Sequence, residues 1–299
     1  MRTFIATLWV LLFSQIAIAQ ITMQTVNGEE GSMELYVTNM GNVPYTILID
    51  YTERANLNSS GNSGLVVARP GKSKVATLNR VKEGQTTSLA YTYSFIKGDY
   101  FGKSKKDPLY LIPLSEGTVV TGNRMTHIEN QLQPNKENTD YVGVSFSFDM
   151  PTEILAPRKG VVSEISMNKY PDKNNLAFDR SENYIELFHD DGSLTKIMVL
   201  RPGSEKVKLG QEVFPGDVLA ESGGEDYNSG LHVRLANMKP VKDGKSKLKY
   251  EMVPMKFISK EGVSDLAKSE RLNVVHPEEV ITAEMSKKEL KAFLAGNPD

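Results

Sequence analysis

The chain has 299 residues and a formal charge of −2, and single cores seldom grow past about 250 residues, so two domains are expected. A nearly neutral chain argues against nucleic acid as a partner, because phosphate binding needs a concentrated positive surface. The chain has no cysteine, so there is no disulfide framework and any metal must be held by histidine and carboxylates.

Residues 1–19 have the pattern of a secretory signal peptide. Arg2 gives a basic start, residues 4–13 form an apolar run, and Ala17 and Ala19 make a small-x-small ending. The run is too short to span a membrane comfortably, and no later stretch approaches transmembrane length. We therefore expect an exported protein, periplasmic or extracellular, with no membrane span in its mature form.

Residues 20–100 predict a β-sandwich that is immunoglobulin-like in the broad sense. Apolar and polar positions alternate with a period of two, most clearly in residues 43–51 and 89–95. Turn-forming stretches such as residues 58–64 separate the alternating runs. This segment contains no histidine, and we interpret it as a spacer or docking module.

Residues 101–113 are expected to be a linker, and residues 114–260 a second β domain. Within residues 183–236, short apolar runs are separated by Asp-Gly, Pro-Gly and Gly-Gly pairs. Four or five closely spaced strands follow from that spacing. Residues 261–299 are expected to be a polar tail with a short helix that Thr282 could cap.

An alternating run also covers residues 141–150. It predicts a half-buried strand on which Ser147 and Asp149 share a face.

Several motifs follow one another in the second predicted domain. They are FDMP at 148–151, APRKGVV at 156–162, HDDG at 189–192, LRPG at 200–203, GQEVFPGDVL at 210–219 and LHV at 231–233. Together they resemble the lysostaphin/LytM-type zinc endopeptidases, which cut peptidoglycan peptides from an all-β domain called the duplicated hybrid motif. The resemblance covers roughly half of the chain. It implies an all-β fold, with an N-terminal β-sandwich, a C-terminal duplicated-hybrid-motif domain and a short C-terminal helix.

The resemblance also implies a site. In this family zinc is held by a histidine, an aspartate and the second histidine of a His-x-His on a strand, and an open fourth position takes water. Residues i and i+2 of a strand face the same side, so both imidazoles of the pair would enter one groove. His232 stands where the zinc-binding second histidine belongs.

Three other family positions hold residues without the required chemistry. Gly230 replaces the first histidine of the pair, and Val199 stands where a further catalytic histidine is expected. Ser147 replaces the zinc-binding aspartate, and its neutral hydroxyl is a poor zinc ligand. The donors that remain are His127, His232 and Asp149.

The first hypothesis is a catalytically inactive relative that binds peptidoglycan, or a cell-wall hydrolase that it regulates, through its groove and needs no cofactor. Losing one oxyanion donor costs on the order of 10²–10³ in rate, so losing both assisting groups leaves little activity. The second hypothesis is an active zinc metalloendopeptidase that cleaves peptidoglycan cross-link peptides, with Zn²⁺ held by His127, Asp149 and His232. The third is a structural envelope protein. In that case His232 is a hydrogen-bonded core residue, as we expect for His189.

Overall fold

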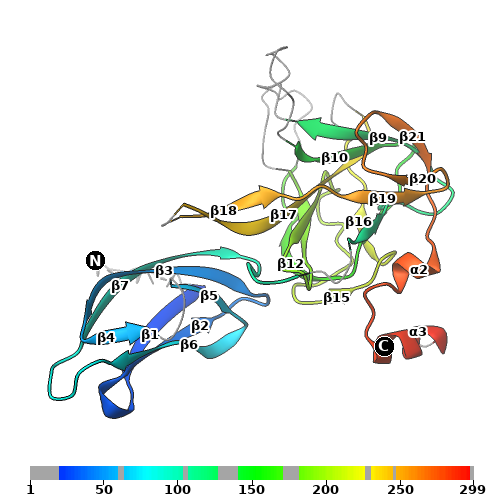
Figure 1. Ribbon diagram of the computed structural model, residues 1–299. Helices are drawn as coiled ribbons and strands as arrows, with labels where there is room; N and C mark the ends of the chain where they lie inside the picture. Colours follow the sequence, from blue (N-terminus) through cyan, green and yellow to red (C-terminus); the bar gives the residue numbers. More distant parts are fainter. Residues whose placement is uncertain are drawn as a thin grey trace, which may run out of the picture.

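The computed structural model describes residues 20–59, 64–103, 107–126, 141–170, 182–225, 230–244 and 247–296. Its elements are almost all β-strands, arranged as an N-terminal sandwich and a larger C-terminal domain (Figure 1). The predicted all-β class with a short C-terminal helix is confirmed. No helix in these ranges is long and apolar enough to cross a membrane. The predicted signal peptide and His127 lie outside the described residues.

The N-terminal sandwich consists of two facing sheets. The first contains, in order, β1 (Ile21–Asn27), β2 (Met33–Asn39), β6 (Gly71–Arg80) and β4 (Leu57–Ser59), with a short turn η1 (Glu29–Gly31) between β1 and β2. The second contains β5 (Leu65–Ala68), β3 (Tyr45–Ala55) and β7 (Ser88–Lys97). Apolar residues at alternate positions of both sheets fill the core between them, including Leu35, Val37, Ile47, Ile49 and Leu78.

A nine-stranded sheet dominates the C-terminal domain. Its order is β15 (Glu212–Val213), β12 (Gly160–Ser166), β13 (Tyr184–Phe188), β14 (Leu194–Met198), β17 (His232–Asp243), β10 (Tyr141–Ser147), β9 (Val119–Thr126) and β21 (Glu270–Asn273), with β18 (Lys247–Met252) paired to β17. Smaller sheets pair β11 (Glu153–Leu155) with β16 (Val218–Glu221), and join β20 (Gly262–Ser264), β19 (Lys256–Ser259) and β8 (Leu109–Leu111). The sheets enclose one core, in which Phe146, Ile197, Val233 and Phe257 are buried.

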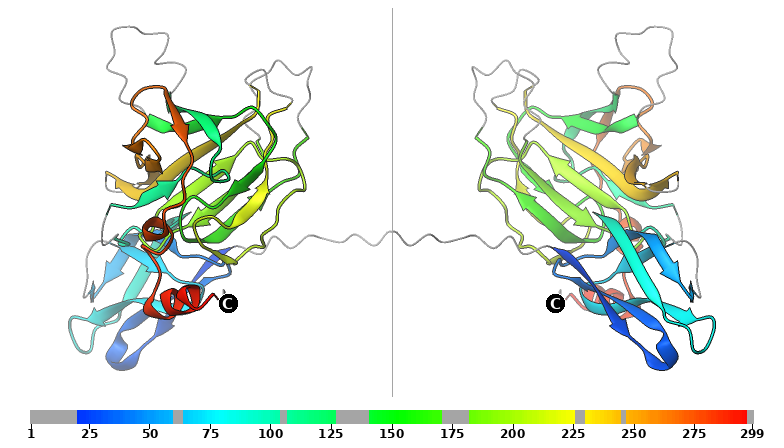
Figure 2. Two further views of the ribbon diagram at one scale, coloured as in Figure 1. Left: turned by 90° about the vertical axis from the view of Figure 1, so that its right-hand side faces the viewer. Right: turned by 90° about the vertical axis from the view of Figure 1, so that its left-hand side faces the viewer.

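The two domains are in direct contact, with the sandwich lying below the C-terminal domain in both side views (Figure 2). The Nζ atom of Lys97, at the end of β7, lies 2.6 Å from Glu164 Oε2 and 2.7 Å from Glu186 Oε1. Asn42 Nδ2 donates to the carbonyl oxygen of Val162 at 2.6 Å. The Lys97 pairs are charged and partly buried, and together with the Asn42 hydrogen bond they hold the sandwich against strands β12 and β13.

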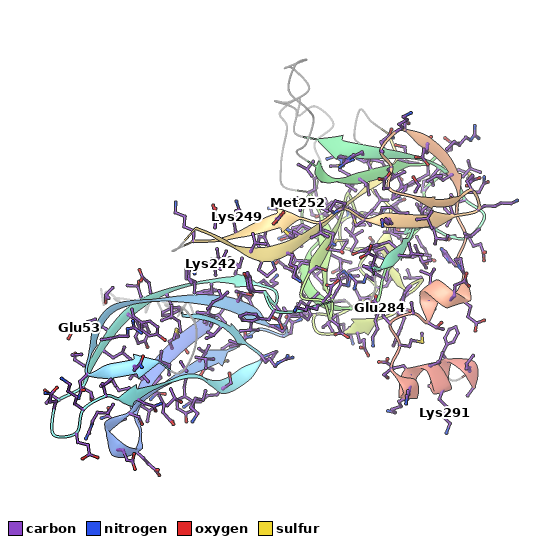
Figure 3. All side chains as sticks on the ribbon, viewed as in Figure 1. Glu53, Lys242, Lys249, Met252, Glu284 and Lys291 are labelled. Atoms are coloured by element: carbon purple, nitrogen blue, oxygen red, sulfur yellow. The ribbon has the colours of Figure 1, made fainter. Side chains whose placement is uncertain are left out.

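Close backbone approach strengthens this contact. A Cβ atom on Gly102 would lie 2.5 Å from the carbonyl carbon of Asp191, so only glycine fits there. The β17–β18 hairpin adds further bonds, since Lys239 Nζ donates to Gly102 O at 2.6 Å and the Tyr250 hydroxyl donates to Lys97 O at 3.0 Å. Figure 3 shows Lys242 and Lys249 on this hairpin, which projects over the sandwich.

The C-terminal segment is tied to the domain by Arg158. The guanidinium is 1% exposed, donates twice to the Glu284 carboxylate at 2.7 Å, and pairs with Asp191 Oδ2 at 2.9 Å. Two short helices flank Glu284, α2 (Glu278–Ile281) and α3 (Lys287–Leu294) (Figure 3).

The start of the last helix differs from the prediction. Thr282 ends α2, and α3 begins after Ser286. Ser286 and Glu289 form a capping box, in which each side chain bonds the backbone N–H of the other residue. This reciprocal bonding explains why the helix starts there. The Glu289 carboxylate also accepts from Lys159 Nζ at 2.8 Å, which holds α3 near strand β12.

Candidate functional site

The candidate site lies where strand β17 begins, between β14 and β10. The antiparallel register of β10 and β17 places Ser147 opposite His232. Just beyond the ladder, the backbone N–H of Phe148 donates to Leu231 O at 3.2 Å. Ser147 and His232 are therefore cross-strand neighbours, and the Cβ atoms of such a pair are typically about 5 Å apart.

His232 is buried and has a defined tautomer. Its Nδ1 atom lies 2.7 Å from the Gly230 carbonyl oxygen, and because a carbonyl only accepts, Nδ1 carries the proton and Nε2 is the basic nitrogen. Burial lowers the pKa of His232; the hydrogen bond to Gly230 opposes this, and Arg234 lowers the pKa further. The imidazole is therefore neutral at neutral pH, with the tautomer that suits a ligand role through Nε2.

Gly230 does not lie on the strand. β17 begins at His232, and Gly230 precedes it with φ +71°, in the left-handed region. Strand alternation therefore does not relate position 230 to position 232 in this chain, because it holds only for extended backbone. A Cβ atom added at Gly230 would meet nothing within 4 Å. The position supplies a carbonyl oxygen to His232 and no side chain.

Val199 is buried in a strained conformation. Its φ is +69°, which is rare for a β-branched residue. Two backbone hydrogen bonds hold it there, since its N–H donates to Asn183 O at 3.0 Å and its carbonyl accepts from the Gly223 N–H at 2.9 Å. Such strain costs on the order of 1–3 kcal/mol and persists only when surrounding structure enforces it. An aliphatic side chain at this point can neither move a proton nor donate a hydrogen bond.

Asp149 lies beyond the end of β10. The strand stops at Ser147, and the chain bends at Asp149, which is exposed. The predicted strand through residue 150 is therefore too long, and strand alternation does not place Ser147 and Asp149 on one face. Pro151 helps to explain the difference, because it has no N–H for the ladder and restricts the residue before it.

Arg234 and Glu182 are site residues that the sequence analysis missed. They form an ion pair, and Arg234 also lowers the pKa of His232. Arg234 is two residues beyond His232 on the same strand, so the alternation rule could have identified it. Glu182 precedes β13, and only the folded chain brings it to β17.

Two large exposed side chains belong to segments that are connected to the site residues through the backbone. Met150 is 75% exposed and follows β10, and Tyr170 is 81% exposed. Asn183 holds the backbone beside Tyr170, because its side-chain amide bonds both the N–H and the carbonyl of Lys169 at 2.8 Å. The Asn183 carbonyl oxygen also accepts a hydrogen bond from the Val199 N–H, so the backbone at Lys169 is connected through Asn183 to Val199.

His189 has the structural role expected from its position. It is fully buried, with Nδ1 2.7 Å from Lys159 O and Nε2 2.7 Å from Thr195 Oγ1. Burial, aided by Arg158, lowers the pKa of His189 to about 3. The ring is therefore neutral at physiological pH, and both of its nitrogens are engaged inside the domain.

The described part of the site does not fit a tetrahedral zinc ion, which needs three protein ligands. Across the described ranges, no group of three His, Cys, Asp or Glu side chains could hold a metal ion. At the candidate site His232 stands beside a neutral hydroxyl at Ser147 and the bare backbone of Gly230. His127 lies outside the described residues.

Comparison with known families finds a match within the C-terminal domain. The model of the family described as Peptidase family M23 matches residues 139–245. This range contains the four site positions Ser147, Val199, Gly230 and His232. The resemblance inferred from the motifs is confirmed by this match. No curated protein matches the chain.

Three of the solved structures that match this chain are described here, and all have low sequence identity to it. The SpoIIQ–SpoIIIAH pore-forming complex has 18% identity and a TM-score of 0.33, covering 48% of this chain and 89% of that chain. A putative peptidase M23 from Pseudomonas aeruginosa has 15% identity and a TM-score of 0.28, and the match covers 65% of this chain and 82% of that chain. Helicobacter pylori Csd3 has 10% identity and a TM-score of 0.32, and the match covers 93% of this chain and 79% of that chain.

Proposed function

We propose, from the premise that residues 139–245 are a domain of peptidase family M23, that this chain is an exported, non-catalytic member of the family. It binds peptidoglycan peptides, or a cell-wall hydrolase that it regulates, at the candidate site. One observation carries the proposal. The serine at position 147 faces His232 in the strand register, and the family resemblance predicts a zinc-binding aspartate at this position.

The chemistry of the remaining positions supports the absence of turnover. Hydrolysis of an amide needs a group that moves a proton and a donor for the developing oxyanion. Val199 is buried and aliphatic, and Gly230 contributes only backbone. Because each lost donor costs on the order of 10²–10³ in rate, the two replacements together are expected to reduce cleavage below detection.

Binding is supported by the side chains around the site. Met150 and Tyr170 are large and exposed. Met150 follows strand β10 soon after Ser147, and the backbone beside Tyr170 is bonded to Asn183, which also bonds Val199. Apolar and aromatic side chains of this kind supply contact area to a peptide without requiring a metal. His232 is neutral and held by Gly230, so it can take part in hydrogen bonding inside the site.

Three measurements on the mature chain test the proposal. Zinc is quantified by elemental mass spectrometry, fragments released from purified peptidoglycan are counted, and binding is measured by co-sedimentation with peptidoglycan and by capture of purified cell-wall hydrolases. We expect substoichiometric zinc, no released fragments and saturable binding to one of these two partners. Combined Met150→Ala and Tyr170→Ala substitutions should abolish that binding. Leu209→Ala, at another exposed apolar position, should leave it unchanged.

Other results would contradict the proposal in specific ways. Stoichiometric zinc with peptide cleavage, both lost in His127→Ala, Asp149→Ala or His232→Ala, would establish the active zinc endopeptidase. Failure to bind either peptidoglycan or hydrolases would favour a structural envelope protein.

A further inference from the structure

Arg234 lies at the centre of the outer face of the nine-stranded sheet. The two residues that flank it on β17 belong to the buried core, whereas Arg234 itself is partly exposed. Its register partners are Ser145 on β10 and Met198 on β14. Directly opposed residues of antiparallel strands share one face of the sheet, and so do residues i and i+2 of one strand. Arg234 therefore shares this face with His232 and with both partners.

The same row of side chains continues over two further strands. Asn123 on β9 is opposite Ser145, and Tyr184 on β13 is opposite Met198. All five side chains of the row, Arg234 included, are partly exposed. Because neighbouring strands lie about 4.8 Å apart, the row extends over about 19 Å, which is the length of roughly six residues of an extended peptide. Its amide, hydroxyl and guanidinium groups offer hydrogen bonds to such a peptide.

One carboxylate of the described chain holds the Arg234 guanidinium. The Nη1 atom pairs with Glu182, whose side chain is 12% exposed. The Arg234 side chain is 23% exposed, and none of its nitrogens is among the described polar atoms that are buried without a partner. A guanidinium has five N–H donors in a planar fork. The donors that Glu182 does not use are therefore accessible to a second partner.

Two other arginines of this chain each pair with two carboxylates, through different nitrogens of the fork. The pairs are Arg158 with Glu284 and Asp191, and Arg201 with Glu221 and Glu225. The geometry of the fork suits carboxylates, because parallel N–H groups meet parallel oxygens. By the same chemistry, Arg234 has the capacity for one further carboxylate.

The other charges on this face do not oppose an acidic ligand. Lys196 is in the next row of the face, and its Nζ atom lies 4.1 Å from the centroid of the Tyr184 ring. The carboxylates further along, Glu164 and Glu186, are both bonded to the Lys97 ammonium. A carboxylate beside Arg234 would therefore meet cations and neutral groups, and the nearby acidic side chains are already paired.

We propose that Arg234 binds a free carboxylate of a peptide that lies across this face. Glu182 positions the guanidinium, and the ligand supplies the second carboxylate. The inference rests on the proposed function and names the chemistry by which the site selects its ligand. Of the two partners proposed above it favours peptidoglycan, whose peptides carry free carboxylates.

Amidation of the ligand tests the inference on the unmodified protein. Carbodiimide and ammonia convert the carboxylates of purified peptidoglycan to neutral amides, and co-sedimentation compares the affinity of the full-length mature chain for the two forms. We expect amidation to weaken binding about 10- to 100-fold, because hydrogen bonds between charged groups are strong. Arg234→Gln should weaken binding to untreated peptidoglycan by a similar factor. It should also make the chain insensitive to amidation, because both changes remove the same contact.

Two further variants separate recognition by Arg234 from general charge attraction. Arg234→Lys keeps the charge but lacks the fork, so its affinity for untreated peptidoglycan should lie between those of the unmodified chain and Arg234→Gln. Arg54→Gln removes an exposed cation of the N-terminal sandwich and should leave both affinities unchanged. Circular dichroism checks that the variants fold. If Arg234→Gln unfolds because Glu182 loses its partner, Arg234→Lys takes its place.

The outcomes distinguish this inference from the proposed function. Equal binding of untreated and amidated peptidoglycan would overturn the inference and leave the proposed function intact. The same holds if the Arg234 variants remain as sensitive to amidation as the unmodified chain, or if the chain captures a hydrolase and binds neither form of peptidoglycan. A chain that binds none of these partners would contradict the proposed function, and this inference with it.

Discussion

Ser147 and His232 face each other across the antiparallel pair of β10 and β17. The hydroxyl at position 147 is neutral, so nothing there balances a positive charge on the imidazole. A carboxylate at this point would favour the protonated imidazole and would add an oxygen ligand beside its nitrogen. A substitution at position 147 therefore tests most directly whether a metal-binding pair can be formed with His232.

Ser147→Asp is expected to raise the pKa of His232 and to tighten zinc binding about tenfold, since binding follows the number of suitable ligands. The pKa is read from an NMR titration of the His232 ring, and zinc affinity from competition with a chromogenic chelator. Ser147→Asn has the same shape without the charge and should change neither quantity. An unchanged His232 titration in Ser147→Asp would mean that the two side chains do not interact.

Because of His189, the folded protein should lose stability on acidification at pH values well above the usual pKa range of carboxyl groups. Its pKa is about 3 in the folded chain and about 6.5 when unfolded. The unfolded chain therefore binds more protons between these values, and stability falls as pH decreases from about 6.5 toward 3. His189→Gln should reduce the slope of the unfolding free energy by about 1.4 kcal/mol per pH unit between about pH 4 and 6.

Urea unfolding at several pH values measures this slope. His276→Gln is the matched control, because His276 lies in the C-terminal segment and contacts the Leu114 carbonyl. It should leave the slope close to that of the unmodified chain. Equal slopes for the unmodified chain and His189→Gln would contradict the assignment.

The sequence predicted the features that depend on local periodicity. Alternating apolar residues predicted the strands that carry Ser147 and His232, and the strand register sets these two residues opposite each other. Sequence periodicity did not predict the left-handed backbone of Gly230 or Val199. A positive φ at valine depends on tertiary hydrogen bonds from distant residues, and the residue type argues against it.

Long-range polar contacts were also beyond sequence reasoning. Arg158 lies within a motif that indicated only the scaffold, and its partner Glu284 is 126 residues away. No local pattern connects two such residues. The sequence showed a polar tail with a helix, and only the fold reveals that a buried guanidinium holds this tail against the domain.

Lys97→Met should destabilise the contact between the two domains. Lys97 Nζ lies between Glu164 and Glu186, and the Glu186 side chain is 4% exposed. Removing the cation leaves two carboxylates facing each other across β12 and β13. We expect the free energy of unfolding at pH 7 to fall by about 2–3 kcal/mol, less than for a fully buried pair because Glu164 is partly exposed.

The pH dependence of this destabilisation shows whether it arises from the charges of Lys97 and the carboxylates. Burial alone would raise the pKa of Glu164, but Lys97 and Tyr184 lower it overall, so its contribution is lost as pH falls below about 4.5. Burial opposes protonation of Lys97, but the carboxylates raise its pKa overall, so its contribution is lost only above about pH 10.5. The difference between variant and unmodified chain should therefore be largest between these limits. Lys249→Met removes an exposed pair with Asp243 and should cost less than about 1 kcal/mol.

Glu284→Ala should release the C-terminal segment from the domain. The Arg158 guanidinium would keep its ion pair with Asp191 and its place over the Tyr110 ring, 5.5 Å from the ring centroid. It would lose both hydrogen bonds to the Glu284 carboxylate. A buried charge that loses one partner is costly, and we expect about 2–3 kcal/mol because Glu284 is partly exposed. Urea unfolding measures the loss, and limited proteolysis reports whether α2 and α3 become accessible.

Two comparisons separate the ion pair from a general loss of contacts. Glu284→Gln keeps the size of the side chain and one acceptor oxygen but removes the charge, so its cost should lie between those of the unmodified chain and Glu284→Ala. Glu279→Ala changes an exposed carboxylate on α2 and should alter neither stability nor cleavage. If Glu284→Ala unfolds at the same urea concentration as Glu279→Ala, Arg158 does not depend on Glu284, because its remaining partners satisfy the buried charge.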